Sequence, residues 1–184
     1  MNRGARRIAA VGGGLGVTVA LAGCGLLGSG PAPIAPSVMT VSSASLIRGD
    51  IMPSRYTCEG GHAVSPPINW SGAPKGTQSI AIVFDDSDAP ITPYVYWIVY
   101  DIGPGTSAIL DGQLPPGARQ ARGSAGYDRY DAPCPGQPGH DYRITVYALN
   151  RTLKLPNGTS LLSAWQGIAA ATIGRGRVTV RATS

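Results

Sequence analysis

The sequence predicts a mainly β domain that carries one helix and follows an export signal. Three observations support this fold class. Two segments are rich in β-branched and aromatic residues and almost unbroken in apolarity, as buried strands are. Two further segments near the C-terminus alternate between residues for opposite faces of a sheet. Only one segment has apolar residues at helical spacing, and long glycine-rich and proline-rich turns separate the elements.

The first 23 residues have the features of a bacterial signal peptide. Three arginines lie within the first seven residues, and the apolar stretch 8–22 is too short to span a bilayer permanently. Residues 21–24 then read Leu-Ala-Gly-Cys, which resembles the lipobox, where the cysteine sulfur carries a lipid. We therefore expect Cys24 to bear acyl chains such as palmitate and to anchor the protein at the extracytoplasmic face of the cell membrane. The alternative is an ordinary signal peptide with a chance cysteine.

The charge balance gives little support to nucleic-acid binding. The full chain has 15 basic and ten acidic residues, a formal charge of +5. Removing the signal peptide removes three arginines and no acid, so the mature charge falls to +2. The remaining basic residues are scattered along the chain instead of clustered, and we expect no nucleic-acid partner.

The mature chain divides into a tether and one domain. Residues 24–37 are rich in glycine and proline without a periodic apolar pattern, which is typical of a flexible tether. Residues 38–184 carry one continuous set of strand signals without a second linker, so a single domain is expected.

The expected elements follow in chain order. The predicted strands are Ser79–Phe84, Val95–Ile102, Tyr142–Leu149 and Arg177–Ala182. Helical spacing predicts a helix over residues 159–172, bracketed by Gly158 and Gly174 and capped by Thr159 or Ser160. Residues 103–126 are predicted to form a surface loop.

Cys58 and Cys134 remain as an even pair in a chain expected to reach an oxidising compartment. A disulfide between them would close a loop of about 76 residues and would stabilise the fold by about 4 kcal/mol in the chain-entropy model. The alternative is two free buried thiols.

Polar side chains gather at the ends of two predicted strands. Asp86 and Asp88 follow a buried strand, and Pro90 fixes the direction in which the chain leaves it. His140 and Tyr142 are two residues apart in a strand, so their side chains share a face and can hold the oxygens of a phosphate or carboxylate. The alternatives are structural: such aspartates often accept backbone N–H bonds two residues on, and a lone histidine is often structural.

Four sets of segments, taken in chain order, resemble the phosphatidylethanolamine-binding protein family, and specifically its bacterial Raf-kinase-inhibitor-like branch. They are residues 49–53 with 56–60 and 65–70; residues 85–90 (Asp-Asp-Ser-Asp-Ala-Pro), similar to the family's Asp-Pro-Asp-x-Pro signature; residues 96–101; and residues 126–127 with 132–135 and 139–142. The resemblance covers most of the mature chain. It implies a large central antiparallel sheet packed on a smaller sheet, with one or two peripheral helices.

The resemblance also implies a pocket for a small ligand. The implied ligand-binding residues are Asp86, Asp88, Pro90, Tyr96, Trp97, Pro135, His140 and Tyr142. Three positions depart from the family pattern: Tyr96 replaces a usual histidine, Asp141 a usual arginine and Gly136 a second proline. Arg143 points to the opposite face and does not replace the missing arginine. We therefore expect a pocket with a weaker or altered preference for phosphate head groups.

The function expected from these features is a membrane-anchored protein that binds a small anionic or polar ligand, such as a phospholipid head group. The alternative is an exported inhibitor or scaffold that acts on another extracytoplasmic protein. A hydrolytic enzyme is a third class, with Asp86, Asp88 and His140 as acid and base. We expect no enzyme, cofactor or metal site, since the usual nucleophile, phosphate-loop and zinc-helix motifs are missing from the sequence.

Overall fold

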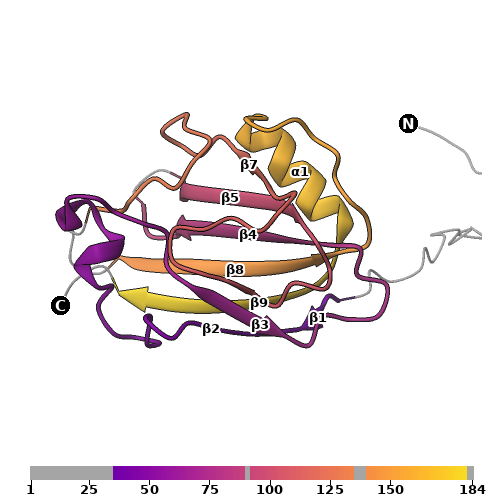
Figure 1. The fold of residues 1–184 in the computed structure, drawn as a ribbon, viewed down its shortest axis with the longest axis horizontal. Helices are drawn as coiled ribbons and strands as arrows, with labels where there is room; N and C mark the ends of the chain where they lie inside the picture. The colour runs from indigo at the N-terminus through magenta and orange to yellow at the C-terminus, as the bar shows by residue number, and fades with distance from the viewer. Residues whose placement is uncertain (1–34, 90–91, 135–139, 182–184) are drawn as a thin grey trace, which may run out of the picture. The chain divides into compact units, whose positions relative to one another are not determined.

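Two β-sheets and one α-helix form the part of the chain that the computed structural model describes, namely residues 35–89, 92–134 and 140–181 (Figure 1). The large sheet has the order β1 (Ser37–Val38), β9 (Thr172–Arg181), β8 (Asp141–Leu149), β4 (Ser79–Asp86), β5 (Tyr94–Ile102) and β7 (Arg119–Ala121). The small sheet has the order β2 (Thr40–Ser42), β3 (Ile68–Ser71) and β6 (Ala108–Ile109). Two 3₁₀ helices, η1 (Ser54–Tyr56) and η2 (Cys58–Gly60), precede β3, and α1 (Leu161–Ala171) precedes β9. The expected signal peptide and Cys24 lie outside the described residues.

The large sheet is antiparallel except at one edge. Four of its five strand pairs are antiparallel, whereas β1 runs parallel to β9. The small sheet is wholly antiparallel. The predicted architecture, a large sheet on a smaller one with a peripheral helix, is confirmed.

Alternation along the strands gives the large sheet two apolar faces. On β4, Ile80, Ile82 and Phe84 pack in the core that contains residues of the small sheet, while Ala81 and Val83 pack in the core that contains residues of α1. Successive side chains of a strand point to opposite faces, so one strand contributes to both cores. This explains why β4 is almost unbroken in apolar residues.

The helix begins and ends close to the predicted bounds. Ser160 caps α1, with its hydroxyl oxygen accepting a hydrogen bond from the Ser163 backbone N–H at 3.1 Å. Ala164, Ile168 and Ala171 are buried against the large sheet. In the part of the chain that the structure covers, no helix is long and apolar enough to cross a membrane.

The last strand is longer than predicted. Only residues 177–182 were predicted as a strand, and Gly174 was expected to mark the end of the helix, but β9 begins directly after α1 and contains Gly174. Glycine is required here by close approach, because a Cβ at Gly174 would touch the Pro74 ring and a Cβ at Gly176 would overlap the Met39 carbonyl oxygen. Because these two glycines interrupt the apolar alternation, the sequence alone does not indicate the first half of β9.

The predicted loop 103–126 contains two short strands, β6 and β7. The outer edge of β7 is covered by the segment before α1: the Gly158 N–H donates to the Gln120 carbonyl and the Arg122 N–H to the Thr159 carbonyl. The outer edge of β9 is likewise covered, with Met39, Gly49 and Met52 N–H groups donating to its carbonyls. Neither edge of the large sheet therefore ends in a long bare strand.

The predicted disulfide between Cys58 and Cys134 is present, with the two Cα atoms 5.1 Å apart. The Cys58 N–H also donates to the Pro133 carbonyl at 3.0 Å. The bond fixes the segment ahead of residue 135 to η2.

Gly176→Ala is expected to lower the free energy of unfolding by about 1–3 kcal/mol, as overpacking typically does. The physical reason is the overlap of the new methyl group with the Met39 backbone. Urea unfolding followed by tryptophan fluorescence measures the change. Gly105→Ala is the matched control, because nothing lies within 4 Å of a Cβ there; equal losses in the two variants would contradict this explanation.

Candidate functional site

The paired ends of β4 and β8 bring the predicted polar residues together. The two strands pair without a register shift, so that Asp86 lies opposite Tyr142. His140 directly precedes β8, and its Nδ1 lies 2.6 Å from Asp86 Oδ2. Tyr142 and the Asp86–His140 pair lie on the small-sheet side of the large sheet, so His140 and Tyr142 share a face, as the alternation predicted.

Asp86 is an orienting carboxylate. It is only 3% exposed and accepts two hydrogen bonds, from His140 Nδ1 and, at 2.9 Å, from the Asp88 backbone N–H. The bond from the Asp88 N–H is the local turn bond that the sequence analysis gave as the structural alternative for these aspartates. Because an ionised carboxylate only accepts, the proton between the pair belongs to His140 Nδ1, and Nε2 faces away from Asp86.

Asp88 fixes the start of β8. Its Oδ2 accepts the Asp141 backbone N–H at 3.0 Å and the Ser87 hydroxyl at 3.3 Å. Unlike Asp86, Asp88 is exposed. Both aspartates therefore position the chain around His140, and Asp88 also carries a solvent-facing negative charge.

A β-bulge places Tyr96 beside the polar residues. The register between β4 and β5 shifts after the pair Phe84 and Trp97, so Tyr96 is the extra residue of β5. Its ring lies 5.1 Å from that of Phe84 and 5.7 Å from that of Tyr142, measured between centroids. The bulge turns Tyr96 toward the small-sheet face, where it is half-buried.

The tyrosines of this site remain protonated at neutral pH. Burial, then Tyr142 and the charge of Asp86, raises the pKa of Tyr96. Burial and then Asp86 raise the pKa of Tyr142. Burial, together with the hydrogen bond to Asp131, raises the pKa of Tyr94 to about 12. Their hydroxyl groups are therefore neutral hydrogen-bond donors, and the Tyr94 hydroxyl already donates to Asp131.

The structure brings together five of the eight predicted site residues: Asp86, Asp88, Tyr96, His140 and Tyr142. Tyr142 is only 2% exposed, so its main role is to pack behind the other site residues. Trp97 is buried, contacts Tyr130 edge-on and donates from Nε1 to Gln120 Oε1 at 2.5 Å. The other two, Pro90 and Pro135, lie outside the described residues.

Two aromatic neighbours were missed by the sequence analysis. Tyr94 lies 4.7 Å from Tyr96 between ring centroids and donates to Asp131 at 3.0 Å. The sequence could have indicated Tyr94, because it lies two residues before Tyr96 in a strand and so shares its face. Tyr130 stacks on Phe84 at 5.9 Å, and no periodic pattern marks it, because it lies in a long loop.

A histidine held by a buried aspartate lies beside tyrosines at the end of a large sheet packed on a small one, and these features define a two-sheet β-protein with a polar site at its strand ends. The comparisons with known proteins specify the class. The sequence model described as "Phosphatidylethanolamine-binding protein" matches residues 42–183. The chain therefore belongs to the phosphatidylethanolamine-binding protein family.

Individual relatives agree with this assignment. LppC of Mycobacterium tuberculosis, which carries a lipoprotein name, is 37% identical over an alignment that covers 90% of each chain. The crystal structure of Escherichia coli YbcL, described as a member of the mammalian family, has a TM-score of 0.71 and 29% identity, and covers 77% of this chain and 96% of its own. Chlamydia trachomatis CT736, described as a family homolog, has the same TM-score with 26% identity, covering 78% and 96%.

Asp86→Ala is expected to lower the free energy of unfolding by about 1–3 kcal/mol, because two hydrogen bonds to a buried acceptor are lost. It should also remove the preference of His140 for a proton on Nδ1. Urea unfolding and ¹H–¹⁵N NMR of the imidazole rings measure the two effects, with His62 as an internal reference. Asp50→Ala, at an exposed acid, is the control; an unaltered His140 spectrum in Asp86→Ala would refute the orienting role.

Proposed function

We propose that this protein is a membrane-anchored, extracytoplasmic binding protein that takes a small polar or anionic ligand beside His140. The observation that carries the proposal is the His140–Asp86 pair. A buried acceptor fixes one nitrogen of the ring, and the partly exposed side chain presents the other to a ligand.

The donors around His140 suit a phosphate or carboxylate oxygen. The Tyr96 hydroxyl and His140 Nε2 can each contribute one hydrogen bond, and Nε2 donates when the ring is protonated. In contrast, Asp88 and Asp131 place negative charge at the same end of the sheet. A ligand with an anionic and a cationic end, such as a zwitterionic head group, satisfies both better than a simple anion does.

Binding without turnover is the second part of the proposal. Both oxygens of Asp86 already accept hydrogen bonds, and one oxygen of Asp88 holds the backbone of Asp141. A general base needs an oxygen or nitrogen within reach of the proton it removes. These carboxylates support a role in positioning His140 more than a role in catalysis.

Anchoring through Cys24 is the third part. The sequence around Cys24 resembles a lipobox, and LppC, related over 90% of each chain, is named as a lipoprotein. Lipid chains on one cysteine would hold the domain at a membrane surface, since each buried CH₂ contributes about 0.8 kcal/mol.

His140→Ala is expected to weaken binding of O-phosphoethanolamine by about tenfold or more, the loss typical of a charge-assisted hydrogen bond. Tyr96→Phe should weaken the binding less, because the aromatic ring at position 96 remains and only its hydroxyl group is lost. NMR titration of residues 25–184, the portion that contains every described element, measures both. His62→Ala, at the only other histidine, is the matched control. Titrations with ethanolamine and with inorganic phosphate identify the recognised end, and unaltered affinity in His140→Ala would refute the site.

Cys24→Ala is expected to move the full-length protein from lipid-labelled to unlabelled in cells fed an alkyne analogue of palmitate, since the acylated sulfur is removed. Click labelling of the immunoprecipitated protein measures this. Ser29→Ala, in the predicted tether, is the control and should keep its label. Persistent labelling of Cys24→Ala would show that the lipid is attached elsewhere.

A further inference from the structure

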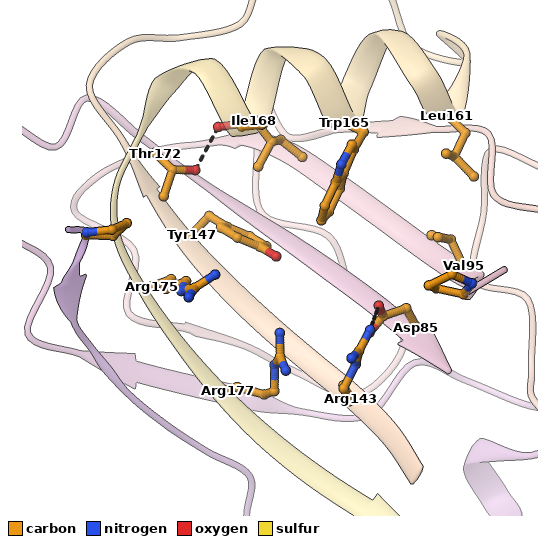
Figure 2. A pocket seen from close by; sticks show the side chains of 13 residues that line it. Asp85, Val95, Arg143, Tyr147, Leu161, Trp165, Ile168, Thr172, Arg175 and Arg177 are labelled. Atoms are coloured by element: carbon orange, nitrogen blue, oxygen red, sulfur yellow. Dashed lines mark hydrogen bonds and ion pairs between the residues drawn. The ribbon is translucent and has the colours of Figure 1, made fainter. Parts of the chain in front are cut away.

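A cavity lies on the face of the large sheet that is opposite to His140, between the sheet and α1 (Figure 2). Its volume is about 550 Å³, within the range of small-molecule sites. Figure 2 shows Trp165 and Leu161 extending from α1 toward the sheet, with Tyr147 between the helix and the strands below. The Tyr147 and Trp165 rings meet edge-to-face, 6.2 Å apart. These side chains give the cavity an apolar and aromatic wall.

Three arginines line the opposite side of the cavity. Arg143 belongs to β8, and Arg175 and Arg177 belong to β9. Arg175 pairs with Tyr147 and Arg177 with Thr145 across the two strands, so both arginines point to the α1 side. The Arg177 Nε donates to Thr145 Oγ1 at 2.9 Å, which restricts its guanidinium group.

Only one of these positive charges is compensated within the lining. Arg143 is bidentate to the buried carboxylate of Asp85, with Nε 3.0 Å from Oδ1 and a second bond from Nη2 to Oδ2. Three arginines and one aspartate leave two positive charges. Arg175 and Arg177 are exposed and form no ion pair with any residue that the structure describes.

We propose that this cavity is a second binding site, for a small amphipathic anion. The anionic group, a phosphate or a carboxylate, would lie between Arg175 and Arg177, whose guanidinium groups match such oxygens. The apolar part would lie against Trp165, Tyr147 and Leu161. The two uncompensated arginines and the apolar wall thus favour one kind of occupant: a negative head joined to an apolar body.

This site is separate from the one beside His140. Asp85 and Asp86 are successive residues of β4, so their side chains point to opposite faces of the sheet. Asp85 accepts from Arg143 on the α1 side, while Asp86 accepts from His140 on the small-sheet side. The inference therefore does not depend on the function proposed for the His140 site.

The test uses decyl phosphate and decanoate below their micellar concentrations, titrated into residues 25–184. Trp165 is 42% exposed, whereas Trp70 and Trp97 are only 5% and 3% exposed. Binding should therefore change the emission of Trp165 and saturate. The phosphate and carboxylate arms show which head group is preferred, and decyltrimethylammonium, with the same chain and the opposite charge, should bind at least about tenfold more weakly.

Three variants locate the binding. The double variant Arg175→Gln with Arg177→Gln should raise the Kd for both anions by about tenfold or more. The double variant Arg122→Gln with Arg151→Gln removes the same charge at exposed positions outside the cavity and should leave the Kd unchanged. Trp165→Phe should abolish the fluorescence change while calorimetry still detects binding.

Three results would overturn the inference. Equal affinity for the ammonium probe would show apolar partitioning without charge recognition. An unchanged Kd in the Arg175 and Arg177 double variant would show that the anion binds elsewhere. His140→Ala should leave the decyl phosphate Kd unchanged, and a loss in that variant would assign the probe to the His140 site instead.

Discussion

The unshifted pairing of β4 with β8 is the constraint on which both sites depend. Eight consecutive residue pairs, from Ser79 with Leu149 to Asp86 with Tyr142, keep one register. Period-two alternation then assigns every side chain to a face. A slip of one residue would exchange the faces of Asp85 and Asp86, separating each carboxylate from its basic partner and turning the apolar residues of β4 toward the wrong core.

The sequence predicted the strands and the helix in which apolar residues recur at a regular spacing. The cores of β4, β5 and β8 and the helix with its Ser160 cap were found because their residues serve mainly packing. The first half of β9 was missed because Gly174 and Gly176 serve backbone proximity, which depends on segments far away in the chain. Strands β6 and β7 were missed because two or three residues are too few to show a period.

For the His140 site, the sequence could predict only those features that depend on residues close together in the chain. Alternation placed His140 and Tyr142 on one face, and the position of Asp86 at the end of a strand followed from the apolar run before it. The direct bond between Asp86 and His140 required the pairing register, which a single sequence does not contain. The arginine cavity depends on the same information, because Arg143, Arg175 and Arg177 become neighbours only across paired strands.

The covered edges of the large sheet have a consequence for the proposed membrane location. The lipid anchor proposed above would confine the protein to two dimensions, where neighbouring molecules collide often and bare strands favour intermolecular β-pairing. Here the carbonyls of β9 receive N–H donors from the segment around Met39 to Met52, and β7 is bridged by residues 158–159. Each molecule thus occupies its own pairing positions, and this arrangement disfavours fibril-like growth at high lateral density.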